Sequence, residues 1–498
     1  MDYDGAMEGV ALPQSLSEAD IYMVGIKGTG MAALAEILVA GGAHVTGSDT
    51  AEKFYTDDLL RSLGLRYAEG FAASNLPDKI DLVVYSVAYD PARHEELVAA
   101  ASRGLPMITY AEALGKLSGS MPSIGIAGVH GKTTTAALCA VIARAAGLPG
   151  IVLAGSTLSD LGGRATLVQG QSFFIAETCE YRRSFLSFRP VAIVVTSIEA
   201  DHLDYFQDRA DIFSAFEEYA RSLPPRGELI YCADDDGARE LAESISRERP
   251  DIRTTGYGEC AEGEGRVVYL PAPLGEIRFS VGRRPFALRI PGRHNALNAA
   301  AALIATDRAR QIARQKASEV EFAAVARDAV SEFHGTRRRS EIVGDADGVL
   351  ILDDYAHHPT AIAATIAGYR EFYPGRRLVL DFMAHTYSRT KALLGEFGKA
   401  LSAADILILH EIYASAREEN PGDVNGEQLA EAARRYVEDG GGAGRRPAIH
   451  FVKQVMDALP LVERIVQPGD LFVTMGAGNN WELGRALLGT LRQREETP

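Results

Sequence analysis

The residues most able to do chemistry lie in one short stretch, Gly128-Val-His-Gly-Lys-Thr-Thr-Thr135. An apolar run from Ile124 to Ala127 precedes it and predicts a strand, and residues 135–146 favour a helix. A glycine loop between a strand and a helix, ending in lysine and threonine, is typical of a phosphate-binding loop. Its backbone N–H groups and the helix N-terminus would bind anionic oxygens. Lys132 would reach the β- and γ-phosphates, and the Thr133 hydroxyl would ligate Mg²⁺.

The match to the general phosphate-binding pattern is imperfect. That pattern has a further glycine five residues before Gly131, where this chain has Ile126. The alternative interpretation is a glycine-rich turn between a strand and a helix, with a solvated lysine. The order of strand, loop and helix favours nucleotide binding over that alternative.

A second glycine turn, Gly28-Thr-Gly-Met-Ala-Ala33, follows a strand predicted over residues 20–26 and opens a helix predicted over residues 31–40. Asp49 lies 21 residues after Gly28, close to the spacing of the acid in dinucleotide-binding βαβ units. The pattern Gly-x-Gly-x-x-Ala is a weak signal by itself. It is compatible with NAD, with a nucleotide sugar or with a tight turn alone.

Acidic and histidine side chains follow two later strands. Glu180 follows a strand predicted over residues 173–177, and Asp201 and His202 follow one predicted over residues 191–197. Groups at the carboxyl ends of strands in the region of a phosphate-binding loop are placed to meet Mg²⁺ and phosphate. Each carboxylate taken alone could equally be a helix cap or a solvated loop residue.

Two histidine-containing turns follow predicted strands near the C-terminus, Asp353-Asp-Tyr-Ala-His-His-Pro359 and His385-Thr-Tyr-Ser-Arg-Thr390. Adjacent histidines usually point apart, so polar contacts are favoured over a transition-metal site. His385 and Arg389 are four residues apart and could recognise a carboxylate or a phosphate. The alternative for the second turn is a helix N-cap with exposed charges.

Strands and helices alternate along the chain, which predicts an α/β fold with parallel sheets. A length of 498 residues exceeds one ordinary domain. Linker-like composition at residues 117–122 and a change of composition near residues 334–339 divide the chain. We therefore predict three consecutive domains, at residues 1–120, 121–340 and 341–498.

Composition narrows the class of protein. The content of 47% apolar and 24% charged residues is that of a globular protein, and the net charge of −16 argues against nucleic-acid binding. No apolar stretch approaches the roughly 18–20 residues of a membrane span. Four scattered cysteines without CxxC spacing, and an N-terminus without a signal pattern, predict a cytoplasmic protein lacking structural zinc.

Read in order, these stretches resemble the Mur ligase family, and within it the alanine-adding branch. The resemblance covers about residues 20–490. Further motifs that carry it are Gly47-Ser-Asp49, Tyr85-Ser-Val-Ala88, Pro291-Gly-Arg-His-Asn-Ala-Leu-Asn298, Phe333-His-Gly-Thr-Arg-Arg-Arg339 and Gly476-Ala-Gly478. The phosphate-binding loop is shared across a superfamily that includes folylpolyglutamate synthases. The Asp353–Pro359 stretch, taken with the N-terminal glycine turn, points to the alanine-adding branch.

The resemblance implies a Rossmann-like UDP-binding domain, a central P-loop ATPase domain and a Rossmann-like C-terminal domain that binds the amino acid. It implies a monomeric or weakly dimeric ligase that uses ATP and Mg²⁺. The enzyme would join L-alanine to the carboxylate of UDP-N-acetylmuramate through an acyl phosphate.

The resemblance also implies roles for individual residues. The residues expected at ATP are Gly128, Val129, His130, Gly131, Lys132, Thr133, Thr134, Asn295, Asn298 and Arg338. Those expected at the UDP group are Gly28, Thr29, Gly30, Met31, Asp49 and Ser86. The expected Mg²⁺ ligands are Thr133, Glu180 and His202, and the residues expected at the reacting groups are Lys132, His202, His358, His385 and Arg389.

Some positions depart from the usual family pattern, and these leave alternatives open. They are Lys27 in the first turn, Phe71 after Gly70, Ser197, and Met383-Ala384 before His385. One alternative is a recycling ligase that joins a tripeptide to the same nucleotide; another is a nucleotide-sugar-binding regulator without catalysis. Several relatives use a carbamylated lysine after the Asp-His stretch; no lysine occurs between residues 202 and 227, which favours the alanine-adding branch.

Overall fold

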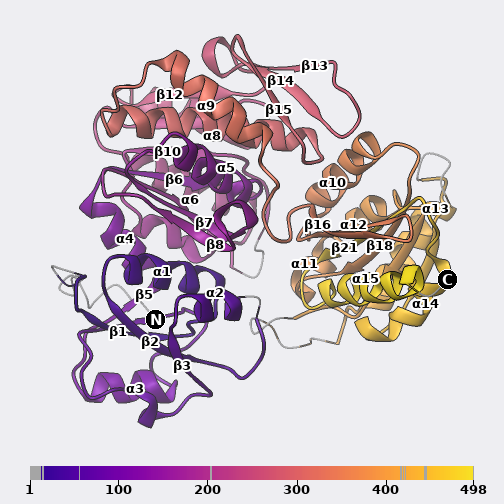
Figure 1. Ribbon diagram of the computed structural model, residues 1–498, viewed down its shortest axis with the longest axis horizontal. Helices are drawn as coiled ribbons and strands as arrows, with labels where there is room; N and C mark the ends of the chain where they lie inside the picture. Colours follow the sequence, from indigo (N-terminus) through magenta and orange to yellow (C-terminus); the bar gives the residue numbers. More distant parts are fainter. Residues whose placement is uncertain are drawn as a thin grey trace. The chain divides into compact units, whose positions relative to one another are not determined.

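The computed structural model describes residues 13, 16–54, 56–201, 205–414, 418, 420, 422–441 and 446–496 (Figure 1). The chain forms two compact units. The first consists of Met1–Ile198, Phe213–Arg266 and Ala299–Ala329, and the second of Glu199–Ile212, Val267–Asn298 and Val330–Pro498. Both units are α/β structures built mainly on parallel strands, so the predicted fold class is confirmed. The domain boundaries at residues 120 and 340 stay predictions.

The N-terminal sheet of the first unit has five parallel strands in the order β3-β2-β1-β4-β5. Its strands are β1 (Asp20–Val24), β2 (His44–Asp49), β3 (Arg66–Glu69), β4 (Leu82–Tyr85) and β5 (Met107–Thr109). Its helices are α1 (Thr29–Ala40), α2 (Thr56–Ser62), α3 (Glu95–Ser102) and α4 (Tyr110–Ser120). The strand order reverses between β1 and β4, and ligands of such sheets bind at the carboxyl ends of the strands beside this point.

The linker predicted over residues 117–122 is wrong in its first part. Helix α4 continues to Ser120, and Leu117 and Ser118 are buried. Local composition suggested a loop because serine and glycine dominate the segment. Packing of the apolar face of the helix overrides that preference.

The larger sheet of the first unit has the order β12-β11-β10-β6-β9-β7-β8, and only β8 runs antiparallel to its neighbour. Its strands are β6 (Ser123–Ala127), β7 (Ile151–Leu158), β8 (Arg164–Val168), β9 (Phe174–Glu177), β10 (Ala192–Val195), β11 (Glu228–Cys232) and β12 (Arg253–Tyr257). The helices in this part of the chain are α5 (Lys132–Ala145), α6 (Arg209–Arg221), α7 (Asp236–Glu248), α8 (Arg293–Ile312) and α9 (Glu319–Ser331). Strand β6, which leads into the phosphate-binding loop, is central and wholly buried.

The second unit contains a three-stranded antiparallel sheet and a six-stranded sheet of order β16-β17-β21-β18-β19-β20. The strands are β13 (Val267–Leu270), β14 (Ile277–Val281), β15 (Arg284–Leu288), β16 (Glu341–Ala346), β17 (Val349–Asp354), β18 (Arg377–Met383), β19 (Ile406–Leu409), β20 (Ala448–Phe451) and β21 (Asp470–Gly476). The helices are α10 (Pro359–Phe372), α11 (Tyr387–Ala392), α12 (Leu394–Leu401), α13 (Gly426–Glu438), α14 (Leu459–Ile465) and α15 (Trp481–Glu496). Short 3-10 helices across the chain are η1 (Ala73–Asn75), η2 (Ser159–Leu161), η3 (Tyr181–Ser187), η4 (Gly263–Gly265) and η6 (Val455–Ala458).

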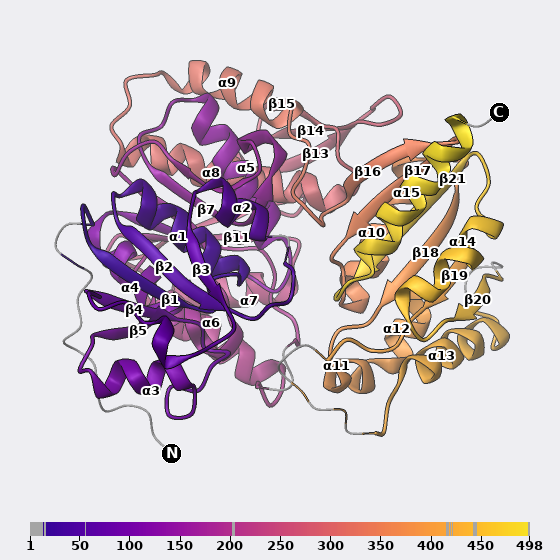
Figure 2. The same ribbon diagram turned by 60° about the horizontal axis from the view of Figure 1, so that its bottom comes forward.

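Alternating residues of the six-stranded sheet supply two separate cores. One core packs α10, α12 and α13 on one face, and the other packs α14 and α15 on the opposite face (Figure 2). This arrangement explains the near-continuous apolar runs of the parallel strands, which are buried on both faces. In the described part of the chain, no helix is both long and apolar enough to cross a membrane.

A chain of polar groups lies inside the second unit, beneath the carboxyl ends of the strands. His410 and Asp381 are fully buried, with Nε2 2.6 Å from Oδ1. Asn480, also buried, donates to Asp381 Oδ2 at 3.2 Å and to the Met475 carbonyl at 2.8 Å. These hydrogen bonds satisfy groups whose burial would otherwise be costly, and they connect β18, β19 and β21.

The buried pair makes the stability of the second unit depend on pH. Burial opposes the charge of His410, but Asp381 and the Val452 carbonyl outweigh it and raise the histidine pKa above its ordinary value of 6.5. A group whose pKa is raised in the folded state contributes its full stabilisation of the fold below pH 6.5. That contribution is lost as the pH rises through the pKa of the folded state. We therefore expect the loss of unfolding free energy in His410→Gln to shrink from acidic to alkaline pH.

Urea unfolding followed by the fluorescence of Trp481 measures this, because the chain has one tryptophan and it lies in α15. His44→Gln is the control, since the His44 side chain is 70% exposed and lies in the other unit. A His410→Gln effect that is constant with pH, or that grows towards alkaline pH, would contradict the assignment.

Candidate functional site

The loop between β6 and α5 has the backbone of an anion site. Gly128 and Gly131 adopt left-handed φ angles of 131° and 82°, and Gly131 is the N-cap of α5. No described side chain caps this helix, and its first turn carries no acidic residue. The first N–H groups of α5 are therefore available to bind an anion, and the positive end of the helix dipole favours an anion at the same place.

The loop approaches the end of β10 so closely that a side chain at Gly128 has no room. A Cβ there would lie 2.1 Å from Thr196 Oγ1 and 2.8 Å from the Ser197 nitrogen. Ser197 Oγ accepts a hydrogen bond from the His130 N–H at 2.9 Å, and the Val129 N–H donates to the Ser197 carbonyl at 3.0 Å. Ser197, one of the departures from the family pattern, thus fixes the loop through its hydroxyl.

Lys132 and Glu180 form the charged part of this site. Lys132 Nζ lies 2.9 and 3.0 Å from the two Glu180 carboxylate oxygens and also contacts the Gly128 carbonyl. The Glu180 side chain is 1% exposed and the Lys132 side chain 12% exposed. Burial opposes the lysine charge, yet Glu180, Cys179 and Glu177 outweigh it and raise the Lys132 pKa. The lysine is therefore protonated at neutral pH.

The donor set here fits Mg²⁺ and phosphate. Carboxylate and hydroxyl oxygens are the ligands that Mg²⁺ prefers, and Glu180 and Thr133 are both buried near the start of α5. Thr134 is buried beside Thr133. The third expected Mg²⁺ ligand, His202, lies outside the described residues, and its role stays a prediction. The roles of the other loop residues likewise stay predictions.

Replacement of Gly128 tests the loop. Gly128→Ala should weaken the binding of ATP on the order of a hundredfold, because it combines backbone strain with a clash against Thr196. The measurement is titration of each variant with ATP and Mg²⁺ by calorimetry. Gly147→Ala is the matched control, since Gly147 has φ +58° but a Cβ there would meet nothing within 4 Å. Equal ATP affinity of the two variants would count against the assignment.

The first glycine turn has a similar open helix end. Gly28 is the N-cap of α1, again with no described side chain capping it, and the first turn from Thr29 carries no acidic residue. Gly30 lies against α4, where a Cβ would be 2.7 Å from the Tyr110 ring. Met31 is buried and anchors the helix. The turn can thus bind an anion with its backbone.

Asp49 and Ser86 lie at the carboxyl ends of the strands beside this turn. The Asp49 carboxylate is buried and accepts hydrogen bonds from the N–H groups of Lys27 at 2.7 Å and Thr50 at 2.8 Å. Burial raises the Asp49 pKa, with these hydrogen bonds opposing the rise. Ser86 lies beside Gly25, and its N–H donates to the Val24 carbonyl. The structure therefore brings together the residues expected at the UDP group.

Among the residues expected at the nucleotide, Asn295 and Asn298 belong to the second unit. Both are buried at the start of α8. Asn298 Nδ2 donates to Asn295 Oδ1 at 3.1 Å, and Asn295 Nδ2 donates to the Pro291 carbonyl at 2.7 Å. Their mutual hydrogen bond fixes both amides, and their contact with a nucleotide stays a prediction.

Arg338 was expected to reach a phosphate, but its side chain is engaged within the second unit. Its Nε donates to Asp353 at 3.1 Å, and its Nη atoms donate to Asn480 and to the carbonyls of Gly476 and Gly478. These bonds use four of the five N–H donors of a guanidinium. In the described structure Arg338 joins the end of β17 to the end of β21, and its contact with phosphate stays a prediction.

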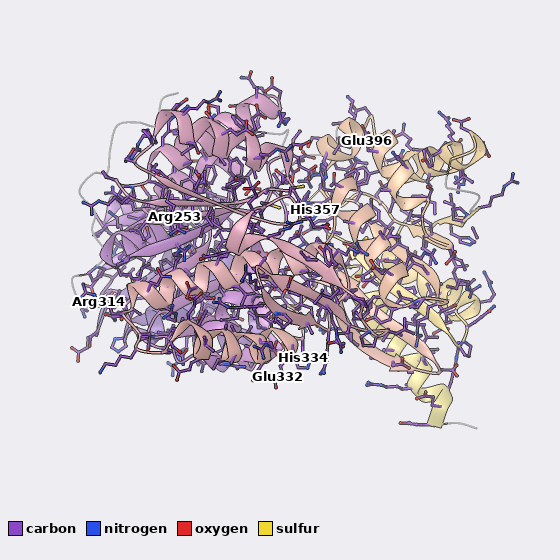
Figure 3. All side chains as sticks on the ribbon, turned by 90° about the horizontal axis from the view of Figure 1, so that it is seen from above. Arg253, Arg314, Glu332, His334, His357 and Glu396 are labelled. Carbon is purple, nitrogen blue, oxygen red and sulfur yellow. The ribbon has the colours of Figure 1, made fainter. Side chains whose placement is uncertain are left out.

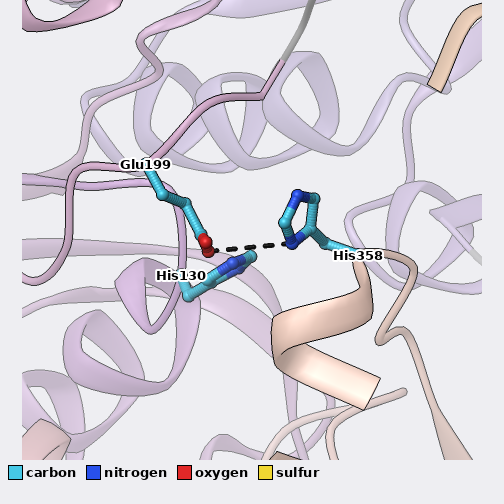
Figure 4. A group of neighbouring side chains, drawn as sticks. All are labelled: His130, Glu199 and His358. Carbon is cyan, nitrogen blue, oxygen red and sulfur yellow. Dashed lines mark ion pairs between the residues drawn. The ribbon is translucent and has the colours of Figure 1, made fainter. Parts of the chain in front are cut away.

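His358, His385 and Arg389 gather at one edge of the six-stranded sheet. Arg389 donates from Nε and Nη2 to Asp201 Oδ1 at 2.9 and 2.6 Å, and its Nη1 lies 3.3 Å from His385 Nδ1. His358 caps α10 and lies 3.7 Å from Glu199 (Figure 4). Sequence reasoning assigned no partner to these groups. It named Asp201 only as a group placed to meet Mg²⁺ and phosphate, and it missed Glu199.

His357 points elsewhere than His358, as expected for adjacent histidines. The Nδ1 atom of His357, which is labelled in Figure 3, lies 2.7 Å from the Tyr355 carbonyl, and its ring packs against His385. Burial, followed by the positive charge of Arg389 and by His385, lowers the His357 pKa well below 6.5. His357 is therefore neutral at physiological pH.

The backbone at this edge is strained. Thr386, the N-cap of α11, has φ 66° and ψ 141°, which a β-branched residue rarely adopts. Its N–H donates to the Tyr413 carbonyl, and its own carbonyl accepts from the Thr390 hydroxyl at 2.7 Å. Such strain is kept mainly at functional sites, and here it lies directly between His385 and the helix that carries Arg389.

Parallel α/β sheets, a P-loop with a buried lysine–glutamate pair and a second glycine turn define a P-loop nucleotide-binding α/β protein. The Mur ligase family, catalytic domain, matches residues 20–120; the Mur ligase middle domain matches residues 126–306; and the Mur ligase, glutamate ligase domain, matches residues 338–478. The chain belongs to the Mur ligase family.

Similar proteins share nearly the whole length. The UDP-N-acetylmuramate–L-alanine ligase of Treponema pallidum is 45% identical over 98% of this chain and 100% of that protein. The protein of the same name from Borrelia garinii is 36% identical over 93% of this chain and 97% of that protein. The crystal structure of a UDP-N-acetylmuramate–alanine ligase from Thermotoga maritima superposes with a TM-score of 0.75 at 23% identity, covering 95% and 99% of the two chains.

Proposed function

We propose that this chain is the ligase that joins L-alanine to UDP-N-acetylmuramate with ATP, a step in the synthesis of peptidoglycan precursors. The observation that carries the proposal is the 45% identity to a ligase of that name over the full length of that protein. The buried Lys132–Glu180 pair, in the loop expected to bind ATP, supports a catalytic rather than a merely binding role.

The chemistry must activate a carboxylate, which is a poor acyl donor. Attack of a carboxylate oxygen of UDP-N-acetylmuramate on the γ-phosphorus of ATP releases ADP and gives an acyl phosphate. The alanine amine then attacks the carbonyl carbon, phosphate leaves, and the amine loses a proton. Positioning and electrostatic stabilisation supply most of the catalysis in such transfers, so no covalent enzyme intermediate is needed.

The residues of the first unit would act on the phosphates. The N–H groups from Gly131 to Thr134 would bind phosphate oxygens, and Lys132 would turn from Glu180 towards the transferring group. Its positive charge would stabilise the charge that develops there. Thr133, Glu180 and His202 would hold Mg²⁺, which supplies further charge neutralisation when bound. Glu180 would then exchange one cationic partner for another.

The residues of the second unit would act on the carboxylates. Arg389 is a fixed, buried cation whose guanidinium suits bidentate recognition of a carboxylate. We propose that Arg389 receives the carboxylate of alanine in place of Asp201, with His385 beside it. His358 would lie at the muramoyl carboxylate.

The assay that tests the reaction measures phosphate release with ATP, UDP-N-acetylmuramate and an acceptor. Release should require all three, and alanine should be used with a higher kcat/KM than glycine, serine or a tripeptide. A preference for the tripeptide would instead identify the recycling ligase, and the Met383-Ala384 departure near His385 makes this comparison necessary. Release that ignores the sugar nucleotide would refute the proposal.

Lys132→Met should lower kcat by at least about a hundredfold, because it removes the charge that stabilises the transferring phosphoryl group. Binding of UDP-N-acetylmuramate, measured by calorimetry, should be unchanged. Lys316→Met, at an exposed lysine, is the control for loss of a positive charge. Turnover of Lys132→Met near that of the wild type would remove Lys132 from the reaction.

A further inference from the structure

We propose that Lys27 is a positioning residue of the nucleotide-sugar site, acting through the backbone that carries Asp49. This inference rests on the proposed function, because it assigns the glycine turn at Gly28 to the sugar nucleotide. None of the roles given above to the turn involves this side chain.

Lys27 lies in the loop that follows β1, the middle strand of the N-terminal sheet, and its side chain is only 1% exposed. Its ammonium donates to the carbonyls of Thr50 at 3.0 Å and Glu52 at 3.1 Å. It also lies 3.3 Å from Asp57 Oδ1 and 3.6 Å from Glu69 Oε1. A buried lysine is stable only when such groups replace its hydration, and here they come from three different segments.

The backbone of Lys27 contacts the same parts of the chain as its side chain. Its N–H donates to Asp49 Oδ2, and its carbonyl accepts a hydrogen bond from the Thr56 hydroxyl. One residue of the glycine turn is therefore bonded to the end of β2, to the segment after it and to the start of α2. Tyr67 on β3 closes the group, with its ring 5.3 Å from the ammonium and its hydroxyl 2.9 Å from Asp57 Oδ1.

The ammonium has no donor left for a phosphate. A lysine carries three N–H donors, and the two carbonyls and Asp57 account for all three. Lys27 differs from Lys132 in its burial and in the origin of its partners. The Lys27 side chain is 1% exposed, against 12% for Lys132, and its partners come from three other segments, whereas the carbonyl partners of Lys132 are Gly128 and Val129 of its own loop. The anion-binding groups of the first turn are the N–H groups of α1, and Lys27 determines how the neighbouring segment faces them.

Asp49 is the group on which this positioning acts. Its two carboxylate oxygens each accept one backbone N–H, from Lys27 and from Thr50. Oδ1 is also approached by the Tyr89 hydroxyl at 3.5 Å, so Oδ2 is the oxygen with a further lone pair for a ligand hydroxyl. Lys27 holds Asp49 directly through its N–H and holds Thr50 through its ammonium, so both supports of the carboxylate depend on one residue. Loss of the ammonium would release the Thr50–Glu52 segment and let the carboxylate turn.

The experiment compares Lys27→Met, Lys27→Arg and a control in full-length protein. UDP-N-acetylmuramate binding is measured by calorimetry, and kcat and both KM values by phosphate release. Lys27→Met should weaken the binding of the sugar nucleotide about tenfold, equivalent to roughly 1.4 kcal/mol, and raise its KM likewise. The KM for ATP and kcat should stay within about twofold, and Lys27→Arg should recover part of the loss.

Lys79→Met is the matched control, because Lys79 pairs with Asp20 in the same unit but its side chain is 73% exposed. Asp57→Asn provides a milder test should Lys27→Met fail to fold, and it should weaken the binding of the sugar nucleotide about two- to threefold. A merely structural role would lower the melting temperature without this selective change in sugar-nucleotide binding, and that result would overturn the inference.

The two proposals fail in different ways. Wild-type ligase activity with unchanged sugar-nucleotide binding in Lys27→Met and in Asp57→Asn would overturn the role of Lys27 alone. A wild-type chain that binds the sugar nucleotide, loses it in Lys27→Met and releases no phosphate would support Lys27 and overturn the ligase. A wild-type chain that does not bind the sugar nucleotide would overturn both.

Discussion

The close approach of the phosphate-binding loop to the end of β10 is the constraint on which the rest of the site depends. Gly128 can adopt its φ of 131° beside Thr196 only because it has no Cβ. The loop then turns through Gly131 and opens α5 with uncapped N–H groups, which places Lys132 next to Glu180. A parallel sheet makes this possible, since the carboxyl ends of β6, β9 and β10 meet at one edge.

Two buried lysines beside glycine turns show how the same residue type serves different ends. Lys132 follows the turn, begins a helix and is bonded to a carboxylate that a bound cation could take over. Lys27 precedes Gly28 and is bonded to the carbonyls of Thr50 and Glu52 and to the carboxylates of Asp57 and Glu69, which belong to three other segments. The first arrangement ties the charge to its own loop and to one carboxylate, whereas the second uses the charge to hold several backbone segments together. Proximity to a glycine turn is therefore not enough to assign a lysine to phosphate.

The sequence predicted the elements whose signals are local. The buried strands β6, β17 and β18 are apolar runs, and the glycine turns mark where each helix begins, although α5 starts at Lys132 rather than Thr135. The threonines there are poor helix formers, but burial of Thr133 to Thr135 decides the start. After β18 the chain forms two short helices, α11 and α12, which meet at Leu393.

Elements without a clear local signal were missed. Strand β7 begins with four apolar residues, Ile151 to Ala154, but Gly155 with φ +70° and two polar residues follow, so the apolar pattern does not continue over the strand. Strand β16 is an edge strand with Ile342 exposed, so its pattern does not mark a core face. The candidate site shows the same division. Residue types marked Lys132, Glu180, Asp201 and Arg389, whereas the pairing of Asp201 with Arg389 and of Glu199 with His358 depends on tertiary contacts.

Backbone strain and buried charge occur together at the carboxyl edge of the six-stranded sheet in the second unit. Thr386, Arg338 and Ser340 all have left-handed φ angles although none is glycine, and each such residue costs roughly 1–3 kcal/mol. Hydrogen bonds from neighbouring strand ends hold these residues: Tyr413 and Thr390 at Thr386, Asp353 and Asn480 at Arg338, and Asp354 at Ser340. Because most of these partners lie at the carboxyl edge of one sheet, the strained residues gather at the edge that also carries His385 and Arg389. A site that recognises a small amino acid gains selectivity from such fixed geometry, since a carboxylate and a methyl group offer few contacts by which to choose it.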